Sequence, residues 1–498
     1  RNALQVIENN AKGVCFIIDK KNCLLGLLTD GDIRRALLKN ADLKSNVKLY
    51  MNKKFISLPI DSDIELINKY LSNKKYKIIP LCKSNGEVVD YVDSANLHSI
   101  SVLSPSLDGN ELKYITECIT TNWISSQGKY VNNFEKIFEN IHPNYYSLAV
   151  SSGTTALHLA LASFGLKKGD EVIVPDFTFA ATINSVLYCN ATPVICEIKH
   201  DTWCIDENKI EELISPKTKA ISAIALYGLP CDFDKILKIA NKHSLFVYED
   251  NAQCMMGTYK NKFSGSLAHG ASFSFQRLKH LTCGEGGMFT TNDENLAQKV
   301  RRQTTLGYAN IASTKGAVTK GELQNPDYDR HISFGFKSRL PELCAAVALA
   351  QLENSEKLID IRLKSAKIFD EVVSKCDWLI PQKASKDHKH VYWSYAVRIN
   401  NPKITWTQFR DEFTKNGGDG IYAAWKLSYQ EPLLQDPDKI GWRSRLISKE
   451  RLSSYKNKGL CPTAEDYQPK ILAFKTDYWN IEKANKQAKI LDKVIKSF

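Results

Sequence analysis

The sequence has no apolar run of the roughly 18 residues that a membrane-crossing helix needs, and it does not begin with the basic and then apolar segments of an export signal. Its 13 cysteines are scattered and never spaced C-x-x-C, which argues against both a disulfide framework and a structural zinc site. We therefore expect a protein of the reducing cytoplasm with no membrane contact and no metal ion. Because Arg1 is not a natural start, we expect residues before it.

The charged residues form no basic tail. The formal net charge of +12 arises from 67 lysines and arginines against 55 acidic residues, and the basic residues are spread along the chain. This distribution favours small anionic substrates over nucleic acid as partners. The 43% hydrophobic content is that of an ordinary globular protein, and 498 residues are too many for one core, so two or three domains are expected.

Residues 1–100 consist of two similar passes of helix, strand, strand and helix. The first contains VCFII and LLGLL before TDGDIRRALL, and the second contains IELINKYLS, YKIIPL and VVDYV. A repeat of about fifty residues predicts two half-units that share one core. Periodicity is lost in SISVLSPSLDGN, residues 99–110, and we place the first domain boundary at about residue 100.

From residue 101 to 365, apolar strand patterns alternate with helical stretches, as in DEVIVP, ATPVICEI, KAISAIALYG, LFVYED and ASFSF. This α/β alternation predicts a mostly parallel sheet covered on both faces, with the chemistry at the carboxyl ends of its strands. Residues 366–498 change to a smaller mixed unit, with HVYWSYAVRI as its clearest strand and NIEKANKQAKILDKVI as a terminal helix.

Two segments place polar residues where such strands end. In SLAVSSGTTALHLAL the strand ends at Val150 and a helix begins near Thr155, so the free amides at the helix start would bind a phosphate. An ordinary Ser/Thr helix cap would explain the same sequence. In LFVYEDNAQC, Asp250 ends a strand and Gln253 follows one turn later. The carboxylate would pair with a protonated nitrogen in the ring of a bound cofactor, and Gln253 would donate to an oxygen on that ring. Alternatively, Asp250 only caps a helix.

The third segment, ASFSFQRLKHLTCGEGG, leads a strand directly into a loop that contains Lys279. A partly desolvated lysine amine is nucleophilic and forms a Schiff base with an aldehyde cofactor. A single lysine is ordinarily just solvated. The glycines that close the loop, however, indicate backbone that turns sharply or approaches another group closely.

Taken together, these segments resemble the sugar aminotransferases of the DegT/DnrJ/EryC1/StrS family, a branch of fold-type I pyridoxal-phosphate enzymes. The resemblance runs from about residue 105 to the C-terminus and includes WISSQGKYVNNFE, DEVIVPDFTFAAT, TKAISAIALYG and GFKSRLPELCAAVALAQLE. It implies a large domain at 101–365 and a small α+β domain at 366–498. It also implies transfer of an amino group, usually from glutamate, to a nucleotide-linked keto sugar for glycan biosynthesis, with pyridoxal 5′-phosphate as cofactor.

Carried over to this sequence, the resemblance makes Lys279 the catalytic residue, which binds the cofactor's aldehyde and then moves protons. The implied cofactor contacts are Gly153, Thr154 and Ser274 at the phosphate, Phe179, Asp250 and Gln253 at the ring, and Lys337 from the partner subunit of a homodimer. The implied substrate contacts are Arg339, Tyr422, Trp425 and Lys426.

Three departures from the family pattern concern the partner contact and the substrate. Many relatives read G-[YF]-N-[YF]-R where this chain reads GFKSR, so Lys337 replaces an asparagine and reaches a phosphate only as a point charge. Leu229 stands where a polar residue is usual, and GGDGIYAAWKLSYQEP differs from the common Y-x-P-x-x-L-H-x-Q. The segments TNWISSQGKYV, DTWCID and LAQLE are most similar to the branch that aminates GDP-4-keto-6-deoxymannose, which is therefore the expected substrate.

Residues 1–100 resemble a pair of CBS domains through GLLTDGDIRRALL. This resemblance implies that Thr29 and Asp32 contact the phosphate and ribose of an adenine nucleotide, although Asp32 also suits a helix cap. Asp93 and Asn96 occupy the matching places in the second copy. Because that match is weaker, we expect at most one nucleotide site, and a pure dimerisation module is the alternative.

Two other functions remain open. A sugar dehydratase of the same fold would have histidine in place of the Schiff-base lysine; His280 is adjacent, but the register from Gly284 puts Lys279 at the reactive position. A catalytically silent nucleotide-binding regulator would keep the CBS pair and lose the cofactor residues, whereas Lys279, Asp250 and Gln253 are all present. The sequence does not determine the nucleotide sugar, the ring carbon or the amino donor.

Overall fold

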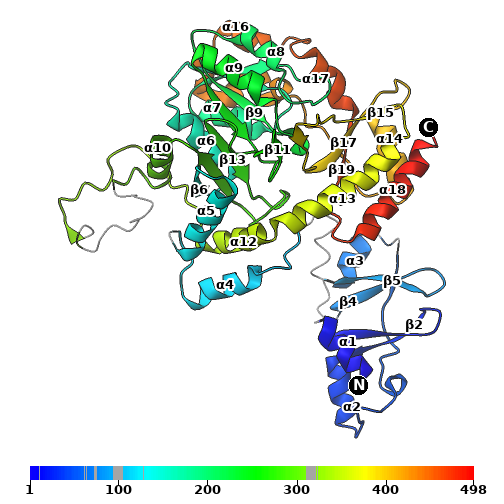
Figure 1. The fold of residues 1–498 in the computed structure, drawn as a ribbon. Coiled ribbons are helices and arrows are strands. Elements are labelled where there is room, and N and C mark those ends of the chain that lie inside the picture. The colour runs from blue at the N-terminus through cyan, green and yellow to red at the C-terminus, as the bar shows by residue number, and fades with distance from the viewer. Residues whose placement is uncertain are drawn as a thin grey trace. The chain divides into compact units, whose positions relative to one another are not determined.

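The computed structural model describes residues 1–10, 12–60, 62, 64–71, 76–93, 105–126, 128–309, 321 and 324–498. The chain divides into two compact units, residues 1–101 and 102–498 (Figure 1). Asn96, one of the residues expected to match a CBS site, lies outside the described residues.

The N-terminal unit contains two small sheets and three helices among its described residues: α1 (Asn2–Asn10), β1 (Val14–Ile18), β2 (Leu24–Thr29), α2 (Asp30–Leu37), β3 (Leu58–Pro59), α3 (Ile64–Leu71), β4 (Ile78–Cys82) and β5 (Val88–Asp93). Strands β1 and β2 pair antiparallel, while β4 pairs parallel with β3 and antiparallel with β5. The first predicted pass is present as helix, strand, strand and helix; of the second, the first helix and both strands are present, and the helix predicted after β5 lies outside the described residues.

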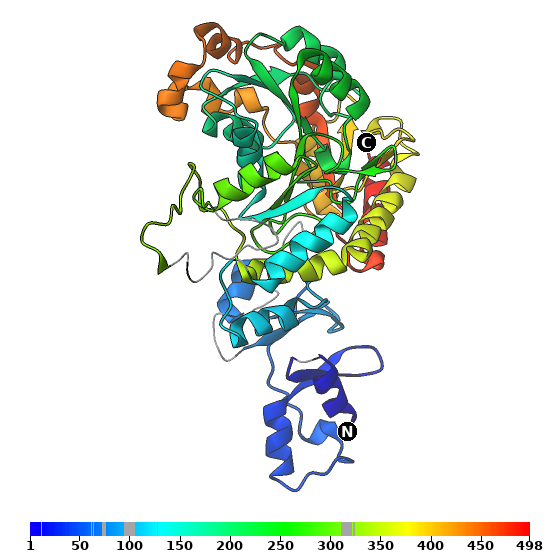
Figure 2. The ribbon, with the colours of Figure 1, turned by 60° about the vertical axis from the view of Figure 1, so that its left-hand side comes forward.

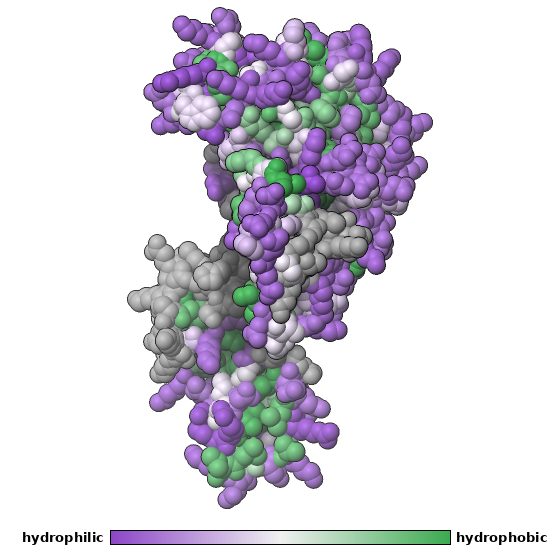
Figure 3. Space-filling view, turned by 90° about the vertical axis from the view of Figure 1, so that its left-hand side faces the viewer, coloured by the Kyte–Doolittle hydropathy of each residue, from purple (hydrophilic) through white to green (hydrophobic). Residues whose placement is uncertain are grey.

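The buried apolar side chains of this unit form two clusters among the described residues, one around Cys15 and Leu28 and one around Ile79 and Leu81. The expectation of a single shared core is therefore wrong for this part. Each pass packs its helix on its own strands, and backbone hydrogen bonds from Leu24 to Gly86 and from Val88 to Asn22 join the two. Apolar side chains such as Leu38 and Leu49 remain exposed, and green patches are visible in the space-filling view (Figure 3).

In the described part of the second unit, seven strands form a sheet in the order β6-β14-β13-β10-β9-β7-β8. Their bounds are β6 (Tyr146–Val150), β7 (Glu171–Pro175), β8 (Thr192–Cys196), β9 (Thr218–Ile224), β10 (Phe246–Asp250), β13 (Gly270–Ser274) and β14 (Gly287–Thr291). Strand β14 is antiparallel to both neighbours, and the other pairings are parallel. The predicted mostly parallel sheet is confirmed.

Alternate residues of these strands enter different cores, as the twofold period of a strand requires. Leu148, Val150 and Phe289 belong to a core with α6 (Gly153–Ser163), α7 (Ala180–Tyr188) and α10 (Glu294–Thr304). Ala149 and Met288 belong to a core with α5 (Lys129–Ile141) and α12 (Glu342–Glu353). Helix α9 (Phe233–His243) lies over the β7–β10 part of that second face. Helices thus cover both faces of the sheet, as Figure 1 and Figure 2 show.

The C-terminal part builds a second sheet, β15-β17-β19-β18, with all pairs antiparallel. Its strands are β15 (Leu379–Pro381), β17 (Ser394–Ile399), β18 (Tyr422–Ala423) and β19 (Ile471–Lys475). The long helix α13 (Ser355–Val373), α14 (Trp406–Lys415) and the terminal α18 (Ile481–Ile495) pack with this sheet around a core that includes Phe369, Phe409 and Phe474. The limits of the large and small domains, 101–365 and 366–498, stay predictions.

The remaining elements are short, apart from α4: α4 (Glu111–Thr120), α8 (Glu207–Ile210), β11 (Thr258–Tyr259), β12 (Lys262–Phe263), β16 (His388–Lys389), α15 (Pro432–Gln435), α16 (Lys449–Ser454) and α17 (Pro462–Tyr467). Among the helices that the structure describes, none combines the length and the apolar character needed to span a bilayer. The described residues also contain no group of three or more His, Cys, Asp or Glu side chains suited to hold a metal ion.

Candidate active site

A cavity of about 440 Å³ opens at the carboxyl ends of β6, β7, β9, β10 and β13. Parallel strands that point the same way bring the residues after each of them to one edge of the sheet. The predicted site residues that line the cavity are Gly153, Thr154, Phe179, Asp250, Gln253, Ser274, Lys279, Tyr422 and Trp425. The three motif segments, which are separated by more than a hundred positions from first to last, therefore meet at one place.

The start of α6 forms one end of this cavity. Ser152 caps the helix by accepting the amide of Thr155, whereas no acceptor for the amides of Gly153 or Thr154 is found among the described residues. A side chain at Gly153 would bring its Cβ to 2.7 Å from Cβ of Ser274. Unpaired amides at a helix start, next to a hydroxyl and with no side chain in the way, form a site for a phosphate group.

The glycines after Lys279 have the function that their pattern predicted. A Cβ on Gly287 would lie 2.4 Å from the backbone of Ser152, so β14 passes too close to the α6 cap for any side chain. Gly284 has φ of +85°, a conformation that favours glycine. The loop that carries Lys279 is thereby tied back against the phosphate end of the cavity.

Asp250 and Gln253 form the buried wall. The Asp250 carboxylate accepts the amide of Ala252 at 3.1 Å and the hydroxyl of Thr182 at 3.1 Å. Burial raises the pKa of Asp250, while those two donors and the charge of Lys279 act to lower it. Gln253 accepts the amide of Tyr227 at 2.7 Å through Oε1, but its buried Nε2 has no partner among the described residues. An unpaired buried donor is costly and indicates a missing acceptor.

Lys279 lies opposite this wall. Its amine is 5.4 Å from the centroid of the Trp393 ring, and the Trp393 indole donates to the carbonyl of Leu278 at 2.7 Å. Burial lowers the pKa of Lys279 to about 8, and the Asp250 carboxylate only partly opposes this effect. A lysine with a pKa near 8 has a substantial free-base fraction close to neutral pH, which makes it a nucleophile.

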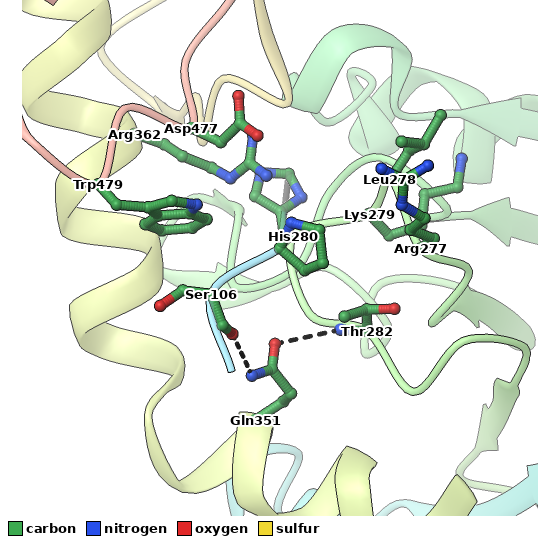
Figure 4. A pocket seen from close by; sticks show the side chains of 11 residues that line it. Ser106, Arg277, Leu278, Lys279, His280, Thr282, Gln351, Arg362, Asp477 and Trp479 are labelled. Atoms are coloured by element: carbon green, nitrogen blue, oxygen red, sulfur yellow. Dashed lines mark hydrogen bonds between the residues drawn. The ribbon is translucent and has the colours of Figure 1, made fainter. Parts of the chain in front are cut away.

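His280 faces away from this cavity. It lies behind the loop and contacts the carbonyl of Val391 at 2.9 Å, and Figure 4 shows the side chains of Lys279 and His280 on opposite sides of their loop. Burial lowers the pKa of His280 well below its usual value. Of these two neighbours, Lys279 lines the cavity and His280 does not.

Helices α12 and α13 support the loop from this rear side, where Figure 4 shows a small second cavity. Gln351 donates to the carbonyl of Ser106 at 2.8 Å and accepts the amide of Thr282 at 3.4 Å. The buried Arg362 donates to the carbonyl of Trp393 at 3.2 Å and to the hydroxyl of Thr476 at 3.1 Å. The same Trp393 that lies under Lys279 is thus held by the C-terminal part of the chain.

Three predicted contacts do not line the cavity of this chain: Lys337, Arg339 and Lys426. Lys337 and Lys426 are exposed, and Arg339 forms a backbone bridge with Val150 at the end of β6. Lining residues that the sequence reasoning did not identify include Tyr227, Glu285 and Trp393. Tyr227 belongs to the segment KAISAIALYG and has φ of +54°, and Trp393 lies within the predicted strand HVYWSYAVRI, but neither pattern pointed to the cavity.

In the N-terminal unit, Thr29 and Asp32 lie together at the start of α2. They form a reciprocal capping box, in which Asp32 accepts the amide of Thr29 at 2.9 Å and its hydroxyl at 2.7 Å. The second Asp32 oxygen pairs with Arg35 at 2.5 Å. Asp93 of the second pass pairs with Lys12 at 2.8 Å. Thr29 is therefore the N-cap of α2, and Asp32, expected as the cap, is instead its partner in the capping box.

Comparison with known proteins finds that the model of the DegT/DnrJ/EryC1/StrS aminotransferase family matches residues 105–438. A GDP-perosamine synthase of Caulobacter vibrioides is 41% identical over 330 residues, which cover 65% of this chain and 82% of that protein. A GDP-perosamine synthase of Escherichia coli O157:H7 is 38% identical over 382 residues, which cover 74% and 98%.

Solved structures have the same fold. An aminotransferase from Psychrobacter cryohalolentis superposes with a TM-score of 0.71 at 26% identity, over 79% of this chain and 98% of that chain. The PLP form of Spr1654 from Streptococcus pneumoniae, described as a sugar aminotransferase, superposes with a TM-score of 0.67 at 21% identity, over 79% and 98%.

Proposed function

Because the chain belongs to the DegT/DnrJ/EryC1/StrS aminotransferase family, we propose that it moves an amino group from glutamate to the keto group of a nucleotide-linked sugar, with pyridoxal 5′-phosphate as cofactor. The observation that carries this proposal is the partly buried Lys279, whose pKa is lowered to about 8, facing Asp250 and Gln253 in one cavity.

The residues present fit this cofactor. The unpaired Gln253 Nε2 is a donor for an oxygen on the ring, and Asp250 is an anion for a protonated ring nitrogen. Gly153, Thr154 and Ser274 form the phosphate end, because the amides of Gly153 and Thr154 lie at the start of α6 beside the Ser274 hydroxyl. Phe179 offers an aromatic face at the mouth of the cavity.

When bound, the cofactor supplies an electron-withdrawing ring that stabilises negative charge on the carbon next to the transferred nitrogen. Lys279 would be the amine that holds the cofactor's aldehyde carbon, and its Nζ would then take and return the proton that moves between the substrate carbon and that same aldehyde carbon, which lies outside the ring. Asp250 would keep the ring nitrogen protonated. A protonated nitrogen beside the Asp250 carboxylate would also offset the cost of burying that charge. Trp393 and the tied loop keep the Lys279 amine on the cavity side.

GDP-4-keto-6-deoxymannose is the acceptor we propose. Two relatives named GDP-perosamine synthase, at 41% and 38% identity, support this choice. We assign Arg339, Tyr422, Trp425 and Lys426 to the acceptor side. Tyr422 and Trp425 line the cavity in the described chain. For Lys337 we propose contact with the cofactor phosphate of a second subunit in a homodimer, which suits an exposed lysine that does not line its own cavity.

For residues 1–101 we propose a CBS pair that binds an adenine nucleotide near Thr29 and Asp32 and alters sugar binding or assembly. Two similar passes and the partly exposed start of α2 support it, although Asp32 is already engaged in the capping box and with Arg35. Calorimetry with AMP, ADP and ATP tests it. Heat of binding that is lost in Asp32→Ala, with a reciprocal change in sugar affinity, is expected. Binding of none of the three nucleotides would reject nucleotide sensing.

Incubation of the purified, cofactor-loaded protein with glutamate and a panel of keto sugar nucleotides tests the central proposal. We expect a product whose mass shows replacement of the ketone oxygen by an amine, with GDP-4-keto-6-deoxymannose as the best acceptor. Lys279→Ala should make no product, while Lys299→Ala, which removes an exposed lysine on α10, should leave the rate unchanged. A dehydrated sugar without added nitrogen would instead support the dehydratase alternative.

A further inference from the structure

The wall of the cavity opposite the sheet is formed by β18 and the segment that follows it. Tyr422, Ala423 and Trp425 line the cavity. Strand β18 is only two residues long and pairs with Leu472 and Ala473 at the edge of its sheet. Such a short edge strand holds a segment weakly, so the position of Trp425 depends on contacts beyond the strand.

One of these contacts is made by Asp176, which follows β7. Its carboxyl oxygen Oδ1 accepts the amide of Ser428 at 2.9 Å, and its backbone carbonyl accepts the hydroxyl of Ser428 at 3.0 Å. Two hydrogen bonds between the same two residues fix both the position and the orientation of the segment. Leu427, which is 1% exposed, is buried in the main core beside them.

The turn that contains Asp176 also reaches the cofactor end of the cavity. Thr178 contacts Thr182 at 2.7 Å, and Thr182 donates to Asp250 at 3.1 Å. One residue further, the Phe179 ring lies 5.2 Å from the ring of Trp425. A single turn therefore joins the cofactor wall on one side to the 422–428 wall on the other.

Burying the Asp176 carboxyl group at this contact costs free energy. It is 1% exposed, and its second oxygen has no hydrogen-bond partner among the described residues. Burial raises the pKa of Asp176 to about 8; the amides of Ser428 and Tyr429 lower it, and the nearby Glu197 and Glu465 raise it further. Glu197 and Glu465 are themselves used as acceptors, for the amides of α17 and for the Tyr429 hydroxyl. A residue retained at such cost calls for an explanation beyond packing.

We propose that Asp176 is a positioning residue for the sugar acceptor: through Ser428 it holds Trp425 against Phe179, so that the aromatic wall is in place when the keto sugar binds. The inference rests on the proposed function only for the identity of the acceptor. It predicts that Asp176 matters for the reaction with the sugar and not for the reaction with the amino donor, which does not need this wall.

The test compares Asp176→Ala, Asp176→Asn and Ser428→Ala with a control, Asp293→Ala, which removes another carboxylate that accepts two backbone amides, at the start of α10. In Asp176→Ala the KM for the sugar nucleotide should rise about tenfold, as expected for loss of one buried hydrogen bond. The rate of the half-reaction with glutamate, followed by cofactor absorbance, should stay within about twofold. Asp176→Asn keeps an acceptor oxygen, so its KM for the sugar nucleotide should stay close to that of the unmodified protein. Ser428→Ala should raise this KM by less than Asp176→Ala does.

Hydrogen exchange of residues 422–430 gives a second readout that needs no substrate. Protection of this peptide should fall in Asp176→Ala and stay near that of the unmodified protein in Asp176→Asn and Asp293→Ala. Unchanged protection in Asp176→Ala, or equal slowing of both half-reactions, would overturn the proposal. If no sugar of the panel reacts with the unmodified protein, the proposed acceptor fails, while the exchange result still decides whether Asp176 holds the segment.

Discussion

The amine of Lys279 should titrate near pH 8 in the cofactor-free protein. Burial lowers its pKa from 10.5 to about 8. At pH 7 an amine with the ordinary value has about 3 free-base molecules in 10,000, whereas a pKa of about 8 gives about 1 in 10, roughly a 300-fold difference in nucleophile. The experiment titrates the Lys279 amine between about pH 6 and 11, first in the unmodified protein and then in Asp250→Asn. Because the Asp250 charge raises the pKa of Lys279, its removal should move the midpoint to lower pH.

Competitive acetylation with trace acetic anhydride measures this titration. Mass spectrometry of the peptide that contains Lys279 gives its reactivity at each pH, with the exposed Lys299 of α10 as the internal reference. We expect the Lys279 curve to reach half its maximum near pH 8. A midpoint at or above 10, or a rise in the midpoint in Asp250→Asn, would refute the reasoning, because burial and the Asp250 charge would then not control the amine.

Further predictions concern the cavity and the buried carboxyl groups. Gln253→Leu should weaken cofactor binding about tenfold in equilibrium dialysis, since it removes the unpaired Nε2 donor; unchanged affinity would mean that this amide does not contact the ring. Gly153→Ala should lower cofactor affinity and cost about 1–3 kcal/mol of stability in urea unfolding, because its Cβ would lie 2.7 Å from Ser274; a fully stable variant would show that the cap can shift. Asp176 has a folded-state pKa of about 8 against an ordinary 3.8, so its contribution to stability is greatest below pH 3.8 and is lost as the pH rises to about 8. Asp176→Asn should remove this decline and gain as much as about 4 kcal/mol over the unmodified protein between about pH 5 and 9, and parallel pH curves for the two proteins would contradict it. Asp32→Ala should cost about 1 kcal/mol in the unfolding of the N-terminal unit through loss of the capping box, and no change in melting would show that the cap is dispensable.

Much of the cofactor side of this site was predictable from short segments. Asp250 ends the apolar strand β10, Gly153 lies three positions after β6, and Lys279 lies five positions after β13; strands that point the same way bring these residues to one edge of the sheet. The order of elements therefore predicted chemistry at this edge of the sheet, and the family resemblance implied which residues form the site there. The role of the glycines after Lys279 was also predictable, because a local sequence pattern indicates a local backbone requirement. Here that requirement is the close approach of Gly287 to Ser152.

The small N-terminal unit shows a limit of such patterns. The two passes were visible as a repeat, but repetition does not say whether their apolar residues merge, and the described residues form two clusters. From the sequence alone, Asp32 could be either a ligand contact or a helix cap. The geometry of its carboxylate, which bonds to Thr29 and Arg35, was needed to show the capping box.

By itself the sequence determined the strand-and-turn segments that carry Lys279, Asp250 and the α6 cap, because each depends on residues within about four positions of one another and on the strand periods that bury them. Only the tertiary structure decided that Trp393 lies under Lys279, that His280 faces away, and that Asp176 bonds Ser428, 252 positions along the chain. Contacts of that range arise when two sheets and their connecting segments pack together. No local period records them, since any residue of suitable size and polarity in either segment fits the same local pattern.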